Sequence, residues 1–112
     1  MEDIVEKAKE LKYEYIALTE HNPSKSKHTD DRIINLLTHK ERVVREKEWG
    51  IKVFNSLEID INADGTLPVP DKGLETLDFA LVSIHSVFNL SKEDMTKRVL
   101  TALAYPKVKI FA

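Results

Sequence analysis

Apolar side chains recur every three or four residues in three parts of the chain, a spacing that places them on one face of a helix. Ser91 and Asp94 fit a capping box at the start of the third part. Gly50 is placed to end the second helix and Pro106 to end the third. The three sets are Ile4, Val5, Ala8 and Leu11, then Ile33, Ile34, Leu37 and Val44, then Met95, Val99 and Leu103.

Four other stretches have the short apolar runs or the alternation that is typical of strands. After the second of them, Asp64 and Gly65 favour a tight reversal between extended segments. Because strands and helices alternate along the chain, we expect an α/β fold with about four mainly parallel strands and covering helices. The four stretches are YEYIALT from residue 13, IKVFNSLEIDI from residue 51, DFALVSIH from residue 78 and VKIFA from residue 108.

Composition narrows the class of protein. The chain has 112 residues, 42% of them hydrophobic and 32% charged, which is ordinary for one globular domain. No apolar run approaches the roughly 18 residues of a membrane span, and the charged N-terminal segment does not resemble a signal peptide, so we expect a cytoplasmic protein without membrane contact. The sequence has no cysteine, which excludes thiolate metal ligands, and its net charge of −2 gives no general attraction to nucleic acid.

Side chains able to bind metal or donate protons stand at the ends of the first three predicted strands. Because the carboxyl ends of parallel strands meet at one edge, where active sites collect, we expect these side chains to lie close together. Two imidazoles and a carboxylate suffice for a zinc, manganese or iron site, so the pattern favours a metal site. The residues are Glu20 and His21, then Glu58 and Asp60, then His85 with Ser83 and Ser86 on either side.

Simpler interpretations of the same residues remain open. A histidine at a strand end is more often hydrogen-bonded or half-exposed than a ligand. Glu58 and Asp60 alternate with apolar neighbours, as the exposed face of a strand would. If the side chains of His21, Glu58 and His85 did not converge, a flavodoxin-like binding module with incidental histidines would be the better interpretation.

Two further groups of polar residues favour ordinary solvated surfaces. His39 stands in the second predicted helix among Lys40, Glu41 and Arg42, where opposite charges can pair. Lys25, Lys27 and His28 follow Pro23 in a loop. Of these, Lys25 and His28 are weak candidates for contacts to a substrate phosphate. Trp49 is expected to pack the end of the second helix against the sheet.

Four segments together resemble the PHP (polymerase and histidinol phosphatase) domain. The resemblance covers essentially the whole chain and is greatest to the version attached to bacterial and archaeal X-family DNA polymerases and to similar stand-alone PHP proteins. It implies a distorted barrel of roughly seven βα units that holds up to three divalent ions of zinc, manganese or iron and hydrolyses phosphoesters. The substrate would be a phosphorylated small molecule or a DNA 3′ end. The segments are YEYIALTEHNPS, SLEIDINADGTLPVP, DFALVSIHSVF and TALAYPKVKIFA.

The resemblance assigns roles residue by residue. His21 resembles the metal ligand of the second motif, Glu58 the carboxylate that bridges two metals, and His85 the ligand of the third motif. Glu58 and His85 are thereby implied to be catalytic. Four neighbours would support these ligands without binding metal themselves: Glu20, where the family more often has Asp, Asp60, Ser83 and Ser86.

Other family motifs have no counterpart in the chain. The opening His-x-His, a later His-Pro and a final Asp-x-His are all missing, so we expect residues 1–112 to be a single partial PHP domain with three of roughly nine ligands. Such a piece should bind metal weakly, hydrolyse slowly or not at all, and self-associate through unpaired strand edges. The alternative is a non-catalytic PHP scaffold of a DNA polymerase, although the presence of His21, Glu58 and His85 favours an active parent.

Overall fold

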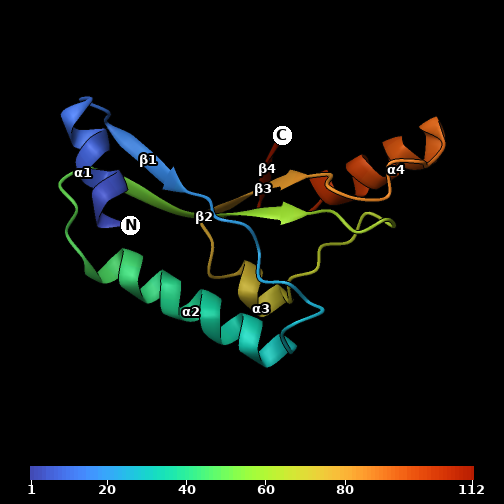
Figure 1. Ribbon diagram of the computed structural model, residues 1–112, viewed down its shortest axis with the longest axis horizontal. Helices are drawn as coiled ribbons and strands as arrows, with labels where there is room; N and C mark the ends of the chain where they lie inside the picture. Colours follow the sequence, from blue (N-terminus) through green and yellow to red (C-terminus); the bar gives the residue numbers. More distant parts are fainter.

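A computed structural model describes residues 1–112 and contains four helices and four strands (Figure 1). None of the helices combines the length and the apolar composition needed to cross a lipid bilayer. In chain order the elements are α1 (Glu2–Glu10), β1 (Tyr15–Leu18), α2 (Asp30–Glu46), β2 (Lys52–Asp60), α3 (Asp71–Leu74), β3 (Phe79–Ser83), α4 (Lys92–Leu103) and β4 (Val108–Phe111).

The four strands form one parallel sheet in the order β1-β2-β3-β4, as the alternation of elements predicts. Helices α2 and α3 lie on the same side of the sheet (Figure 1). Right-handed crossovers between strands in sequential order keep the connecting helices on one face, whereas a flavodoxin-like sheet reverses its strand order. This sheet has no reversal, so the flavodoxin-like alternative does not fit the topology.

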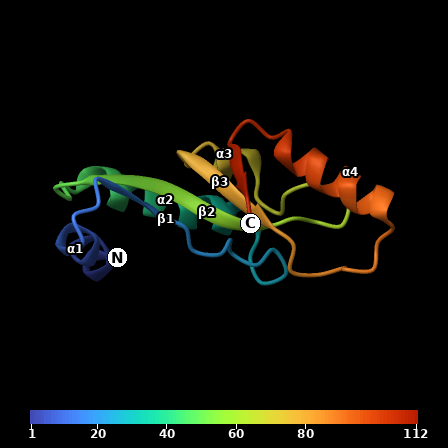
Figure 2. The same ribbon diagram turned by 90° about the horizontal axis from the view of Figure 1, so that it is seen from above.

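The long strand β2 links the two ends of the sheet. Its first part, Lys52 to Asn55, pairs with β1, and its second part, Ser56 to Asp60, pairs with β3. The sheet therefore extends from the first part of β2 toward β1 and from the second part of β2 toward β3 (Figure 2). The carboxyl end of β2 consequently lies between the segments that follow β1 and β3.

Alternation along β2 separates a covered face from an open face. Leu57 and Ile59 are fully buried in the main core, which also contains Ile33 and Leu37 from α2. A smaller core cluster at the other end of the sheet consists of Val5, Leu18, Val44, Trp49 and Val53. Glu58 and Asp60 point to the opposite face, where they stay partly exposed.

Trp49 packs as predicted, but Gly50 does not end the second helix. Helix α2 ends at Glu46, because Lys47 is already extended with ψ of 137°. Gly50 has a φ of +82° and forms the turn into β2. The Trp49 indole is buried, and its Nε1–H donates a hydrogen bond to the carbonyl oxygen of Val44 at 2.9 Å.

Two other sequence expectations are wrong in detail. The chain after Gly65 does not continue as an extended segment but leads to the short helix α3, which the sequence pattern did not predict. On α4 the fully buried positions are Arg98 and Ala102, while Leu103 is exposed. The face of α4 that packs against the core is therefore the one with Arg98 and Ala102, and the predicted apolar residues of this helix lie beside that face.

Candidate metal site

The segment after β1 is held beside β2 by main-chain hydrogen bonds. Glu58 N–H donates to the carbonyl oxygen of Glu20, and Asn22 N–H donates to the carbonyl oxygen of Glu58, each at 2.9 Å. These bonds form an isolated parallel bridge between His21 and Glu58, three residues beyond the end of β1 at Leu18. The bridge places the His21 side chain next to the carboxyl end of β2.

Both histidine rings approach the carboxylate of Glu58. Nε2 of His85 lies 3.1 Å from Oε1 of Glu58, and Nε2 of His21 lies 3.8 Å from Oε2 of the same residue. The centroids of the two imidazole rings are 5.2 Å apart, with an interplanar angle of 66°. The structure therefore brings His21, Glu58 and His85 together from three separate segments.

Asp60 belongs to the same group. Its Oδ1 lies 3.4 Å from Nε2 of His85 and 3.8 Å from Nδ1 of His21. This oxygen is buried and has no hydrogen-bond partner. A buried carboxylate oxygen without a partner is costly unless a cation or donor satisfies it. From the sequence, Asp60 is expected to play a supporting role only, but its carboxylate lies close enough to both histidines to share a cation with them.

The donor set suits a divalent cation. One ligand atom from each of His21, Asp60 and His85 lies within 4.8 Å of the other two. Imidazole nitrogen and carboxylate oxygen are the ligands that zinc, manganese and iron take in proteins without thiolates. The unpartnered Oδ1 of Asp60 gives a physical reason for a cation at this point, so the residues present fit a bound metal.

The remaining expected neighbours differ in what they contact. Ser83 Oγ–H donates to Oε1 of Glu58 at 3.1 Å, which fixes the carboxylate from β3. Glu20 forms an ion pair with Lys40 at 2.8 Å. Ser86 contributes its carbonyl oxygen, which accepts a hydrogen bond from Arg98. Of these three, Ser83 is the one whose side chain contacts a candidate ligand directly.

Hydrogen bonding keeps Glu58 in its charged form. The contact with His85, followed by the hydrogen bond from Ser83, lowers the pKa of the Glu58 carboxyl below its ordinary value, and the positive potential of His21 adds to this effect. A carboxylate with a lowered pKa is ionised at neutral pH. Glu58 is therefore in the form that binds a cation.

Lys40 was expected on a solvated face with His39, and this expectation is wrong. His39 is exposed, but Lys40 is only 8% exposed. Its ammonium donates to the carbonyl oxygens of Leu18 and Ser56, at the point where β1 leaves β2. Burial lowers the pKa of the Lys40 ammonium, and the ion pair with Glu20 opposes this shift. Its spacing from Leu37 and Val44 on the buried face of α2 is the signal that could have identified it.

A hollow of about 460 Å³ opens beside His21 and Asp60. Asn22 fixes one wall, because its Oδ1 accepts a hydrogen bond from the Asp60 N–H at 3.0 Å. Of the residues considered for phosphate contacts, Lys25 lines this hollow. His28 instead contacts the carbonyl oxygen of Ser24 through Nδ1 at 2.9 Å. The other lining residues are His21, Asp60, Ser24, Ile61, Asn62, Ala63, Pro68, Ser86 and Val87.

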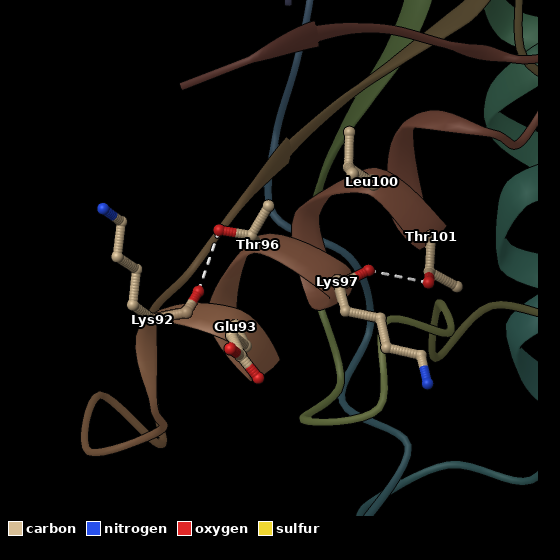
Figure 3. Close-up of a pocket in the computed structure, with 6 residues that line it drawn as sticks. All are labelled: Lys92, Glu93, Thr96, Lys97, Leu100 and Thr101. Atoms are coloured by element: carbon tan, nitrogen blue, oxygen red, sulfur yellow. Dashed lines mark hydrogen bonds between the residues drawn. The ribbon is translucent and has the colours of Figure 1, made fainter.

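A larger hollow of about 740 Å³ lies elsewhere, along α4. All six residues that line it come from that one helix, and Figure 3 shows Lys92 and Lys97 extending away from each other. Two hydrogen bonds are drawn in Figure 3, and both stay within the helix. The Thr96 hydroxyl donates to the carbonyl oxygen of Lys92, and the Thr101 hydroxyl donates to the carbonyl oxygen of Lys97. This surface gathers no set of ligands and is not the candidate site.

Comparison with known proteins gives one informative similarity. No protein-family model matches the chain. The chain is 32% identical over 108 residues to a protein of Bacillus subtilis strain 168 named DNA polymerase/3'-5' exonuclease PolX. The match covers 89% of this chain but 18% of that protein, so the chain spans less than a fifth of the relative's length. The chain is thus similar, over most of its length, to a segment of a DNA-processing enzyme.

Proposed function

We propose that this chain is a single partial PHP domain and forms part of a metal centre that hydrolyses phosphodiester bonds at a DNA 3′ end. The convergence of His21, Glu58 and His85 carries this proposal, because the resemblance implies that these three residues are PHP metal ligands. Their side chains come from three separate segments and approach within 3.1 to 3.8 Å at Glu58.

Two independent observations support membership of this family. The similarity to a polymerase and 3′–5′ exonuclease extends over 89% of the chain. The parallel strands follow one another in sequential order, as successive strands of a βα barrel do. Both observations agree with a distorted seven-unit barrel of which this chain forms about four strands.

The proposed ligands are His21, Glu58 and His85, and the structure leads us to add Asp60. The ions would be zinc, manganese or iron, up to three in a complete domain. A divalent cation held there would neutralise charge on the phosphate and lower the pKa of a water molecule. Ser83 would orient the Glu58 carboxylate through its hydrogen bond. The lowered pKa of Glu58 keeps this carboxylate ionised at neutral pH, which is the form that binds a cation.

The neighbouring hollow would receive the phosphate backbone. Lys25 is the cationic side chain that lines it, and His21 and Asp60 form its inner wall. A lysine ammonium attracts phosphate as a point charge. We favour DNA over a small phosphorylated molecule because the relative is a 3′–5′ exonuclease.

A nuclease assay tests this proposal. The chain would be incubated with Mn²⁺ and a single-stranded oligonucleotide labelled at its 5′ end. We expect slow shortening from the 3′ end that requires Mn²⁺ and falls by about 100-fold or more in His85→Ala, as loss of a positioned acid–base or ligand group does. His39→Ala is the matched control, since His39 is an exposed histidine on α2, and it should cleave at the wild-type rate.

Other outcomes would reject the proposed nuclease. Equal cleavage by wild type and His85→Ala would show that the activity does not arise at this site. Binding of Mn²⁺ without any cleavage would favour the alternative, a non-catalytic PHP scaffold of a DNA polymerase. A substrate preference for small phosphomonoesters over the oligonucleotide would place the chain with the histidinol phosphatases.

A further inference from the structure

Arg98 is a charged residue buried in the structure without an acidic partner among its hydrogen bonds. Its side chain is 1% exposed. The guanidinium donates to four main-chain carbonyl oxygens, those of Ile61, Asn62, Ser86 and Val87, at distances of 2.6 to 3.1 Å. A planar guanidinium can satisfy several acceptors at fixed angles, which the single point charge of a lysine cannot.

These carbonyl groups belong to the two segments that carry the candidate ligands. Ile61 follows Asp60 directly, and Ser86 follows His85 directly. The ladder between β2 and β3 ends at the pair Asp60–Ser83, followed by one bond from Ile61 N–H to the carbonyl oxygen of Ser83. Beyond that point Arg98 cross-links the two segments.

Helix α4 is also packed tightly against the segment after β2, which runs alongside it in both views (Figures 1 and 2). A Cβ atom on Gly65 would lie 2.5 Å from Cβ of Thr101 and 2.8 Å from the carbonyl oxygen of Arg98. The helix that supplies Arg98 therefore lies in close contact with the segment after β2 at Gly65. A neighbouring element in such contact can help to hold ligands at a constant separation.

We propose that Arg98 is a positioning residue of the metal site. By holding the segments after Asp60 and His85, it keeps Oδ1 of Asp60 and Nε2 of His85 at the 3.4 Å separation seen in the structure. Arg98 does not contact the metal ion itself. This inference rests on the metal site of the proposed function, to which it adds a residue from helix α4.

Metal binding by arginine variants tests the inference. Mn²⁺ affinity would be measured by titration calorimetry for wild type, Arg98→Met and Arg98→Lys, at a temperature where circular dichroism shows each to be folded. We expect a loss of about 10- to 100-fold in Arg98→Met, the effect typical of residues that orient ligands, and a smaller loss in Arg98→Lys. Arg45→Met is the matched control, because Arg45 pairs with Asp78, and its affinity should stay within about twofold of wild type, as for a remote site.

A second measurement needs no metal. Nuclear Overhauser contacts between the rings of His21 and His85, whose centroids are 5.2 Å apart, should weaken in Arg98→Met and persist in Arg45→Met. If wild type bound no Mn²⁺, the proposed metal site would be wrong. The contacts between the rings of His21 and His85 would then still show whether Arg98 positions the two segments. Unchanged affinity and unchanged ring contacts in folded Arg98→Met would overturn the inference. If Arg98→Met did not fold, unchanged Mn²⁺ affinity and unchanged ring contacts in Arg98→Lys would overturn the inference.

Discussion

Oε1 of Glu58 and Nε2 of His85 lie 3.1 Å apart although 27 sequence positions separate the two residues. The contact joins the open face of β2 to the segment after β3. It exists because the parallel strands β2 and β3 end at the same edge of the sheet. Glu58 is therefore the side chain around which the candidate site is arranged.

Replacing Glu58 by glutamine should weaken metal binding. The amide has nearly the same shape but lacks the negative charge that attracts a divalent cation, so we expect Mn²⁺ affinity to fall by at least about 10-fold. Titration calorimetry measures the change. Glu75→Gln, an exposed glutamate after α3, is the control that should bind as wild type does. Equal affinity of both variants would remove Glu58 from the ligand set.

Lys40→Met should destabilise the fold. The substitution removes the ammonium group that donates to the carbonyl oxygens of Leu18 and Ser56. A hydrogen bond to a charged group contributes about 1.5–3 kcal/mol, so the free energy of unfolding should fall by about that amount or more. Urea denaturation followed by circular dichroism gives the value. Arg42→Met, an exposed position on the same helix, should change it by less than about 0.5 kcal/mol, and an equally small effect of Lys40→Met would contradict the assigned role.

The acid stability of the protein should depend on Asp78. Burial raises the pKa of this carboxyl, but hydrogen bonds from the Asn55 N–H and from Arg45 outweigh burial and lower the pKa below 3.8. Between the folded-state pKa of Asp78 and the ordinary value of 3.8, the unfolded chain binds a proton that the folded chain does not, so stability falls as the pH is lowered. The stability that ionised Asp78 contributes is present above pH 3.8 and is lost as the pH drops through the folded-state pKa.

Asp78→Asn provides the comparison. At pH 7 the variant should be less stable than wild type by about 1–3 kcal/mol, because the Arg45 guanidinium and the Asn55 N–H lose a charged acceptor. Urea denaturation at pH 7 and at about pH 2.5 would measure the difference at each pH. We expect the difference to shrink at the lower pH. A constant difference would show that the ionisation of Asp78 does not contribute.

Gly65→Ala should loosen α4 from the segment after β2. Gly65 has a φ of +90°, and an added Cβ would overlap Thr101 and the carbonyl oxygen of Arg98. Gly50→Ala is a matched control, since Gly50 has a φ of +82° but its added Cβ would meet only the flexible end of Lys9. Thermal or urea unfolding should show Gly65→Ala to be less stable than Gly50→Ala by about 1–3 kcal/mol, the usual cost of overpacking. Equal stabilities would contradict the close packing of α4.

Strand-end reasoning predicts much of the candidate site, and helix periodicity is the signal that could have identified the two buried basic residues, Lys40 and Arg98. The parallel sheet and the approach of His21, Glu58 and His85 follow from apolar runs that end in polar residues. The closeness of Asp60 follows as well, because Asp60 stands two residues after Glu58 on the same face of β2, while the bridge at His21 is a detail that no local pattern reveals. Lys40 and Arg98 are long charged side chains, for which the usual prediction is exposure, but their positions on the core-facing sides of α2 and α4 bury them.

Short-range signals account for the errors in the fold. Gly50 is typical of a helix end, yet the helix ends at Glu46 because the chain must turn there to bury Trp49 against Val44 and Val53. Helix α3 is a single turn that begins after Pro70. So short a helix has too few residues to show an apolar period. In both places tertiary packing, not local propensity, decides the structure.

Anomalous diffraction from a crystal soaked in Mn²⁺ would locate the metal and its ligands together. We expect a peak within about 2.0–2.3 Å of the imidazole nitrogens of His21 and His85 and of a carboxylate oxygen of Glu58 or Asp60. A crystal in which these four side chains keep their positions but no peak lies among them would contradict the metal site, and with it the proposed phosphodiesterase.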